Sequence, residues 1–270
     1  MTSIGAWLQR HADLDRLALE LLLAETLEVS RSHIIAFPEQ PLDDSTLQAL
    51  CRLCSRLRQG EPTAYLLGHS EFYSLEFQVT PDVLIPRSDT ELLVETALAN
   101  LTGGHHDRVL DLGTGSGAIA ISIAHNSNAQ MVATDASAEA LKVAGANARL
   151  NAADVRFLQG DWFAPVDGCF SVIVSNPPYI AEADPHLPDL HFEPQAALVS
   201  GPEGLNALQQ IWQQAPGYLD NRGWLMLEHG YEQGNAVRSG MAAIGFSHIS
   251  TRRDLGGNER VTIGRWLEGP

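Results

Sequence analysis

The run Asn176-Pro177-Pro178-Tyr179 offers the clearest chemistry in the sequence. It follows an apolar stretch, 170–175, which predicts a buried strand that ends in a rigid turn. The side-chain oxygen of Asn176 and the carbonyl of Pro177 are both acceptors, so together they could hold both hydrogens of an -NH2 group. The nitrogen lone pair would then point toward an electrophile, with the Tyr179 ring against the planar group. The alternative is an ordinary strand-ending turn, because Asn-Pro is a common turn dipeptide.

A glycine-rich turn upstream is the candidate site of that electrophile. Residues 109–121 predict a short apolar strand, the turn Gly113-Thr114-Gly115-Ser116-Gly117 and the start of an apolar helix. Glycines let the backbone approach a ligand closely, and the Gly-x-Gly-x-x-Ala pattern also fits the dinucleotide fingerprint, which is weak evidence alone. We expect Asp111 to face the ligand where a pyrophosphate would sit. Its charge would repel that anion and favour a ligand with an ammonium and a sulfonium.

Two further acidic residues follow the next two predicted strands. Asp135 ends the strand 131–134, where an acid can bind two ribose hydroxyls. Asp161 and Trp162 follow the strand 155–158 and could bracket the edge and face of an adenine, although each taken singly is better explained as a loop acid or a packed aromatic. Ligands of open α/β sheets bind at the carboxyl ends of strands. Three acids at three successive strand ends therefore predict one cofactor site.

Motifs along nearly the whole chain resemble those of the HemK-like peptide chain release factor glutamine N5-methyltransferases. They lie at 60–69, 84–91, 113–117, 176–179, 192–194, 227–230 and 258–260. The Asn-Pro-Pro-Tyr motif is shared with enzymes that methylate DNA adenine, whereas the first two runs are specific to the family. Ser88 stands where the family usually has Pro, so we expect a slightly looser turn there. Gln195 also departs from the family pattern and bears at most on substrate contacts.

The resemblance implies a class I S-adenosylmethionine-dependent methyltransferase. This fold is a Rossmann-like sheet with helices on both faces and an antiparallel last strand, here preceded by a small helical N-terminal domain and a β-hairpin connector. The implied reaction moves a methyl group to the N5 amide nitrogen of the glutamine in the Gly-Gly-Gln motif of release factors, supports translation termination and leaves S-adenosylhomocysteine. The implied catalytic or substrate-binding residues are Asn176, Pro177, Pro178 and Tyr179. The implied cofactor-binding residues are Asp111, Gly113, Thr114, Gly115, Ser116, Gly117, Asp135, Asp161, Trp162 and Asn176.

Three charged residues are possible members of the substrate mouth. Arg87 could hold a carboxylate of the cofactor or a substrate carbonyl, with a structural salt bridge as the alternative. Glu193 and the adjacent Pro194 could shape the mouth, and Glu228 could touch the substrate or cap the adjacent turn. No dedicated base is expected, because an amide nitrogen becomes strongly acidic once it is methylated. We therefore expect the histidines to be packing or rim residues and not catalytic bases.

The hydrophobic periodicity divides the chain into three parts. Residues 1–72 predict helices, since leucines recur at helical spacing, and we expect them to recognise the protein substrate. Residues 73–84 predict an extended, hairpin-like connector. Strands and helices alternate through 85–270, which predicts a methyltransferase domain with a parallel sheet covered on both faces. Two late strands at 246–251 and 260–266 could pair antiparallel.

The charge balance excludes several function classes. The chain has 17 basic and 33 acidic residues and a formal net charge of -16. Direct binding of nucleic acid would need a basic patch, which argues against a DNA adenine methyltransferase. An acidic surface instead suits a basic protein partner.

Two other function classes are disfavoured by the motifs. Asp111 and the Asn-Pro-Pro-Tyr turn argue against a nicotinamide dehydrogenase. The full cofactor set argues against a non-catalytic adaptor built on the N-terminal helices.

The three cysteines predict no metal site and no disulfide framework. Cys51-x-x-Cys54 lies within a helical leucine pattern, and Cys169 stands alone, so a second pair of metal ligands is missing. The N-terminus lacks the basic and apolar regions of a signal peptide, and no apolar run reaches transmembrane length. We therefore expect a reduced, cytoplasmic, monomeric protein with no membrane partner.

Overall fold

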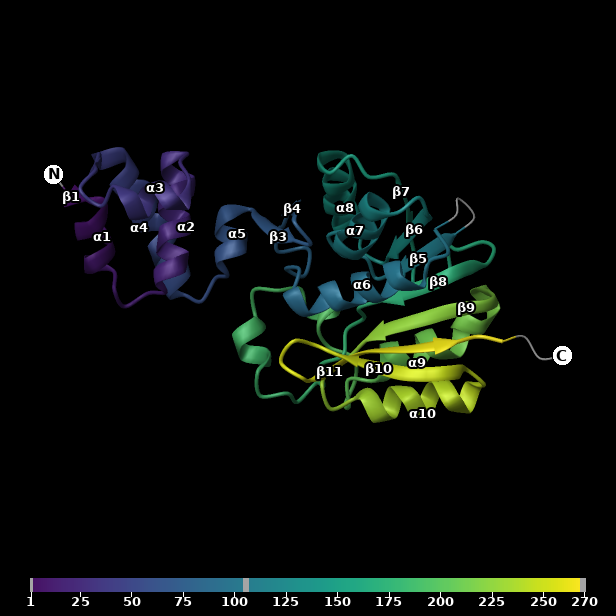
Figure 1. Cartoon of the computed structure of the whole chain (residues 1–270). Coiled ribbons are helices and arrows are strands. Elements are labelled where there is room, and N and C mark those ends of the chain that lie inside the picture. The colour runs from purple at the N-terminus through teal and green to yellow at the C-terminus, as the bar shows by residue number, and fades with distance from the viewer. Residues whose placement is uncertain (1, 104–106, 268–270) are drawn as a thin grey trace. The chain divides into compact units, whose positions relative to one another are not determined.

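The computed structural model describes residues 2–103 and 107–267. The chain forms two compact units, Met1–His69 and Ser70–Pro270, which follow one another along the colour ramp of Figure 1. The boundary that the sequence predicted at residue 72 lies at the end of strand β3 (His69–Phe72), a few residues after the division between the units.

The first unit is built from short helices. They are α1 (Ile4–Arg10), α2 (Arg16–Leu27), α3 (Arg31–Ala36), α4 (Asp44–Arg58) and α5 (Thr63–Leu67), and strand β1 (Thr2–Ser3) pairs with β2 (Pro41–Leu42). The side chains of Asp15, Ser30 and Asp43 each accept a hydrogen bond from a first-turn backbone N–H of the helix that follows, which fixes where these helices begin. The leucine pattern is only partly right about the buried face: Leu22 and Leu50 lie in one core with Leu19 and Leu23, whereas Leu17 of the pattern is 47% exposed.

A hairpin opens the second unit. Strands β3 and β4 (Leu75–Gln78) are joined by Tyr73 and Ser74, both in the left-handed region at φ 52° and 61°, as a two-residue turn requires. Phe72 and Phe77 are fully buried in the core of this unit. The connector expected over 73–84 is thus half hairpin and half irregular chain.

One sheet of seven strands forms the centre of the second unit. The strands are β5 (Arg108–Leu112), β6 (Gln130–Asp135), β7 (Val155–Gln159), β8 (Phe170–Ser175), β9 (Leu219–Glu228), β10 (Ser247–Arg253) and β11 (Glu259–Arg265), in the order β10-β11-β9-β8-β5-β6-β7. Strands β5 to β9 pair in parallel, and β11 is antiparallel to both β9 and β10. The antiparallel last strand expected from the sequence is confirmed. The strand order reverses between β5 and β8, which is where such sheets bind ligands.

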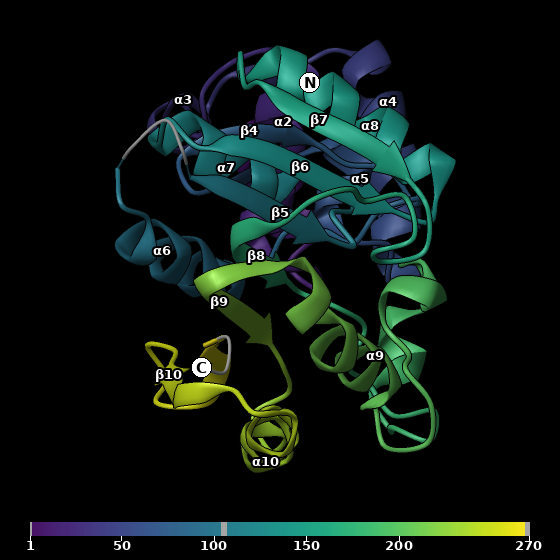
Figure 2. The same ribbon diagram turned by 90° about the vertical axis from the view of Figure 1, so that its right-hand side faces the viewer.

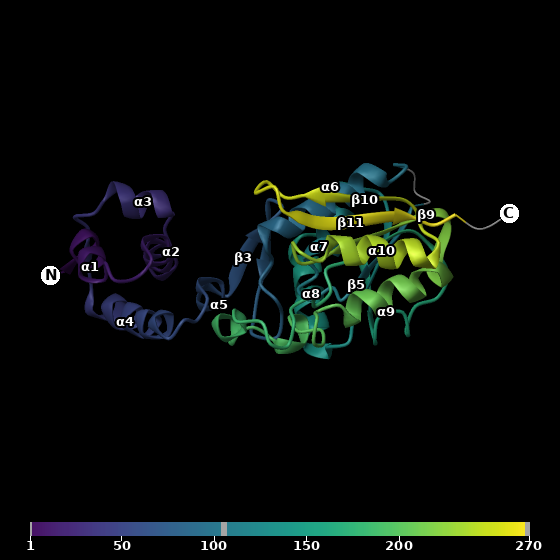
Figure 3. The same cartoon turned by 90° about the horizontal axis from the view of Figure 1, so that it is seen from below.

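Helices cover both faces of this sheet, as Figure 2 and Figure 3 show from two sides. Helices α6 (Glu91–Asn100), α7 (Ala118–Asn126) and α8 (Ala138–Leu150) contribute to one buried cluster, and α9 (Asn206–Gln214) and α10 (Gly234–Ile244) to another. Successive strand residues alternate between the clusters, so Val109 belongs to the first and Leu110 to the second, as the period of a strand dictates. Short 3-10 helices complete the unit: η1 (Ser88–Thr90), η2 (Leu187–Leu190), η3 (Gln195–Ala197) and η4 (Ala215–Tyr218).

Two further observations concern ions and membranes. Among the described residues, no three His, Cys, Asp or Glu side chains gather in a way that could hold a metal ion. None of the helices in the described ranges is long and apolar enough to cross a membrane. Cys54 is buried in the core of the first unit, as the leucine pattern around it predicted, while Cys51 and Cys169 are exposed.

Candidate active site

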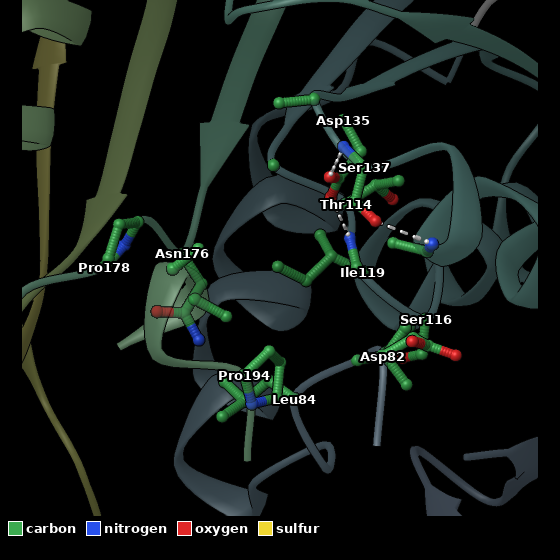
Figure 4. A pocket seen from close by; sticks show the side chains of 18 of the residues that line it. Asp82, Leu84, Thr114, Ser116, Ile119, Asp135, Ser137, Asn176, Pro178 and Pro194 are labelled. Atoms are coloured by element: carbon green, nitrogen blue, oxygen red, sulfur yellow. Dashed lines mark hydrogen bonds between the residues drawn. The ribbon is translucent and has the colours of Figure 1, made fainter. Parts of the chain in front are cut away.

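A cavity of about 470 Å³ opens at the carboxyl edge of the sheet, beside β5, β6, β7 and β8. This volume is in the range of small-molecule sites. Figure 4 shows Asn176 and Pro178 on one side of it, Asp135, Thr114 and Ser116 on the other, and Leu84 and Pro194 along a third. The predicted residues on its wall are Arg87, Gly113, Thr114, Gly115, Ser116, Asp135, Asp161, Trp162, Asn176 and Pro178.

The glycine turn forms the wall between β5 and α7. Gly113 and Gly115 have φ values of 71° and 56°, a conformation that side chains disfavour. A Cβ at Gly113 would lie 3.2 Å from the Trp162 ring, so this position must stay small. Gly117 does not line the cavity. Its φ is 85°, and a Cβ there would lie 2.7 Å from Ile121 Cδ1, so its smallness serves the packing of α7.

Asp111 does not face the cavity, contrary to the prediction. Its side chain is fully buried beneath the turn, and its Oδ2 accepts a 2.6 Å hydrogen bond from Thr114 Oγ1. Its Oδ1 has no hydrogen-bond partner among the described residues. Burial raises the pKa of Asp111 to about 7, because a charged carboxylate loses its hydration there. Asp111 therefore holds the turn from below and makes no direct wall contact.

Asp135 lies on the cavity wall at the end of β6, as predicted. Its Oδ2 accepts from the backbone N–H of Gly115 and its Oδ1 from that of Ser137, each at 2.8 Å. Each carboxylate oxygen can accept more than one hydrogen bond. The side chain is thus fixed by the backbone and still has acceptor capacity for two hydroxyls of a ligand.

Asp161 and Trp162 also lie on the wall, after β7. Asp161 is exposed, and its Oδ2 accepts from Gln210 Nε2 at 3.3 Å. Trp162 has a φ of 45°, and its half-buried ring packs against the core on the face of α9 and α10. The ring also approaches Gly113. The structure therefore brings an acidic edge and an aromatic face to the same side of the cavity.

Asn176 faces the cavity from the end of β8. Its Nδ2 donates to Thr90 Oγ1 at 3.1 Å, which leaves its Oδ1 as an acceptor. Pro178 also lines the cavity, whereas Pro177 and Tyr179 do not. The Tyr179 hydroxyl instead donates to Glu228 Oε1 at 3.4 Å, and its carbonyl accepts from Gln233 Nε2 at 3.0 Å. The predicted stacking surface at Tyr179 is therefore not on the cavity wall.

Buried charge lies behind the Asn-Pro-Pro-Tyr turn. Glu228 is 1% exposed at the end of β9, so it is not a rim residue. Burial raises its pKa to about 7, and the nearby Thr90 hydroxyl and Arg260 guanidinium oppose that rise. Burial and the Glu228 carboxylate also raise the pKa of Tyr179, so Tyr179 keeps its hydroxyl proton and can donate it.

The other two rim candidates pair with each other. Arg87 lines the cavity and forms an ion pair with Glu193. Glu193 is buried, and its Oε2 accepts from the Ile85 backbone N–H at 3.2 Å. The structural salt bridge, which the sequence left as the alternative for Arg87, is what forms. This pair joins the segment before α6 to the loop after β8.

Sequence reasoning missed the wall built by the segment before α6 and by the loop around η3. The missed lining residues include Thr90, Asp82, Leu84, Ala196 and Ala197, whereas Pro194, which the sequence had placed at the mouth, does line the cavity. The run 84–91 was recognised as a motif, but only Arg87 in it received a functional role. Thr90 belongs to the same motif, so the sequence did contain a signal that could have identified it as a site residue. Ser88 is exposed at the start of η1, and Gln195 does not line the cavity although Ala196 and Ala197 do.

Two family models match the chain. The methyltransferase small domain matches residues 88–189, a range that includes the glycine turn 113–117 and the Asn-Pro-Pro-Tyr run. The PrmC N-terminal domain matches residues 5–68, which correspond to the first compact unit.

Curated relatives match over nearly the full length. The release factor glutamine methyltransferase of Yersinia pestis is 47% identical over 268 residues, covering 98% of this chain and 97% of the relative. The protein of the same name from Pseudomonas aeruginosa is 48% identical over 256 residues, covering 93% of this chain and 92% of the relative.

Solved structures share the fold at lower identity. A methyltransferase from Pyrococcus furiosus has a TM-score of 0.59 at 19% identity and covers 80% of this chain and 99% of its own. A 16S rRNA methyltransferase from Thermus thermophilus, solved with AdoMet and guanosine, has a TM-score of 0.55 at 19% identity and covers 73% of this chain and 49% of its own. These similarities identify the methyltransferase fold.

Proposed function

The chain belongs to the release factor glutamine methyltransferase family, and from this premise we propose that its substrate is the glutamine of the Gly-Gly-Gln motif in peptide chain release factors. The protein is an S-adenosylmethionine-dependent methyltransferase. The proposed product carries the methyl group on the N5 side-chain amide nitrogen, and this modification supports translation termination. S-adenosylhomocysteine is the second product.

The residues on one side of the cavity fit this cofactor. Gly113 and Gly115 place bare backbone on the wall, and Asp135 presents acceptors suited to two ribose hydroxyls. Asp161 and Trp162 suit the edge and face of an adenine. When bound, S-adenosylmethionine supplies an electrophilic methyl group. We propose that these residues orient it toward the side of the cavity where Asn176 lies.

The observation that carries the proposed reaction is the orientation of Asn176. Because Nδ2 donates to Thr90, Oδ1 can accept from an amide hydrogen of the substrate. The carbonyl of Pro177, which does not line the cavity in this structure, is proposed to accept the other hydrogen once the substrate amide is bound beside Asn176. Both bonds strengthen as positive charge builds on the attacked nitrogen, so they stabilise the transition state more than the ground state. The methylated nitrogen then carries a positive charge and releases one proton to water, so no dedicated protein base is needed.

We extend the proposal to the partner and the place of action. The first compact unit is proposed to recognise the release factor, as the match of residues 5–68 to the PrmC N-terminal domain supports. The net charge of -16 suits a basic partner and disfavours direct binding of nucleic acid. We also propose that the enzyme works as a monomer and that it acts in the cytoplasm.

Mass spectrometry of a labelled reaction tests the proposed function. The protein is incubated with methyl-labelled S-adenosylmethionine and a purified release factor, and the labelled peptide is sequenced. The expected result is a single methyl group on the glutamine of Gly-Gly-Gln. Label on another residue of the factor would overturn the proposal, as would an unlabelled factor when a parallel incubation with duplex DNA gives labelled adenine.

A further inference from the structure

We propose that Thr90 and the buried Glu228 are positioning residues that hold the Asn176 side-chain amide with its oxygen toward the cavity. This inference rests on the proposed function, in which Asn176 accepts from the substrate amide. Neither residue received this role from the sequence alone. Glu228 is too deeply buried to touch a substrate.

The first step is the contact between Asn176 and Thr90. The Nδ2 to Oγ1 distance is 3.1 Å, and the two residues are 86 positions apart in the chain. Thr90 is 4% exposed, at the end of η1 and just before α6. A hydroxyl that accepts from Asn176 still has its own proton to donate. The direction of that proton decides whether Thr90 can remain an acceptor.

The second step is the carboxylate behind Thr90. Glu228 Oε1 accepts from Tyr179, while Oε2 is buried with no hydrogen-bond partner among the described residues. The Thr90 hydroxyl opposes the rise that burial causes in the pKa of Glu228, although it makes no hydrogen bond to Oε2 in the structure. A buried carboxylate with an unmet acceptor is costly. In this proposal the Thr90 hydroxyl turns its proton toward that carboxylate, which leaves Thr90 to accept from Asn176.

The third step is the choice between the two orientations of the amide. Turning the Asn176 amide by 180° exchanges its donor and acceptor. In the reversed orientation, Oδ1 would need the proton of the Thr90 hydroxyl, and that proton is proposed to point to Glu228. The carboxylate therefore selects, through one hydroxyl, the orientation in which Asn176 presents an acceptor to the substrate. Its bond from Tyr179 holds the same turn from the other end.

Paired substitutions of Thr90 provide the test. Thr90→Val keeps the shape and removes the hydroxyl, and Thr90→Ser keeps the hydroxyl. Thr96→Val is the matched control, because Thr96 is also buried and its hydroxyl donates only to Leu92 O within α6. Steady-state methylation of the release factor gives kcat and KM, and calorimetry gives the cofactor affinity. The side-chain amide signals of Asn176 in asparagine-labelled protein report its orientation without any substrate.

The expected result is a fall in kcat of roughly 10- to 100-fold for Thr90→Val, the effect of one hydrogen bond at a reacting group. KM and cofactor affinity should change far less, and the Asn176 amide signals should shift or broaden. Thr90→Ser should recover most of the lost turnover and restore the signals. The Thr96→Val control should behave as the parent enzyme.

Two outcomes would overturn the positioning role. One is unchanged Asn176 amide signals in Thr90→Val. The other is a loss of turnover in Thr90→Ser as deep as that in Thr90→Val, which would trace the effect to packing. If the parent enzyme fails to methylate the factor, the proposed function fails, while the amide signals still decide the role of Thr90.

Discussion

Thr114 Oγ1 donates a 2.6 Å hydrogen bond to Asp111 Oδ2 beneath the glycine turn. This bond makes Asp111 a support of the turn, while Asp135 stands on the cavity wall. The two acids end neighbouring strands and look equivalent in the sequence, but one is fully buried and the other is open to a ligand. We therefore expect a substitution of Asp111 to change the stability of the fold, and a substitution of Asp135 to change cofactor binding.

The variant Asp111→Asn should change how stability depends on pH. The folded protein raises the pKa of Asp111 from 3.8 to about 7, so between these values the folded state binds a proton that the unfolded state does not. Stability therefore falls as pH rises through this window, by up to about 4 kcal/mol from this group. Denaturant unfolding from pH 5 to 8 should show a shallower fall in Asp111→Asn. The exposed control Asp154→Asn should keep the parent slope.

The variant Asp135→Ala should weaken cofactor binding and leave the fold intact. Each lost charge-assisted hydrogen bond should cost about 1.5–3 kcal/mol at most. Calorimetry with S-adenosylmethionine measures the loss, and circular dichroism checks the fold. Asp154→Ala, which removes an exposed carboxylate at the other end of β7, is the control. Parent affinity in a folded Asp135→Ala would remove Asp135 from the site.

The variant Asn176→Ala should slow turnover roughly 10²- to 10³-fold, the usual effect of removing one hydrogen bond that stabilises a transition state. Cofactor affinity should change much less. Single-turnover methylation of a release factor measures the effect, with the exposed Asn128→Ala as the control. Near-parent turnover in Asn176→Ala would refute the proposed amide grip even if the enzyme acts on release factors.

Turnover should fall as pH drops through about 7, because that is the value to which burial raises the pKa of Glu228. A protonated Glu228 can donate to Thr90, which then no longer needs to accept from Asn176. The charged and titratable groups that face Glu228 are Asp89, Arg260 and Tyr179. Arg260 Nη2 contacts Asp89 Oδ2 at 3.2 Å.

The variant Glu228→Gln isolates this titration. This variant should have a lower kcat at every pH, and its pH profile should no longer show the fall in kcat as the pH drops through about 7. Its cofactor affinity should stay close to that of the parent. The pH profiles of kcat for the two enzymes provide the measurement. An unchanged acid limb in Glu228→Gln would assign the titration to another group.

A fragment of residues 70–270 should bind S-adenosylmethionine and methylate an intact release factor poorly. The fragment keeps the whole second compact unit, including Phe72, which is buried in its core. Calorimetry shows whether the cofactor site is intact, and methylation of the factor is compared with that by the full chain. Methylation at the full-length rate would show that the first unit does not recognise the substrate.

The sequence by itself determined the elements and the edge of the sheet where the site lies. The leucine stripe of the first unit, the alternation of strands and helices, and the polar residues after β5, β6, β7 and β8 follow from local periodicity and turn chemistry. These patterns involve residues that are close together in the sequence, so they can be recognised without a structure. Asp135 and Asn176 were placed on the cavity wall by this reasoning alone.

The tertiary structure decided which of these residues reach the cavity. Asp111 and Tyr179 turn away from it, because each forms a hydrogen bond inside the protein, to Thr114 and to Glu228. Thr90 enters the site through a contact with Asn176 across 86 positions, and Glu193 reaches Arg87 across 106. Such contacts depend on how distant segments pack. Local sequence patterns do not record them, because burial and pairing are properties of the folded chain.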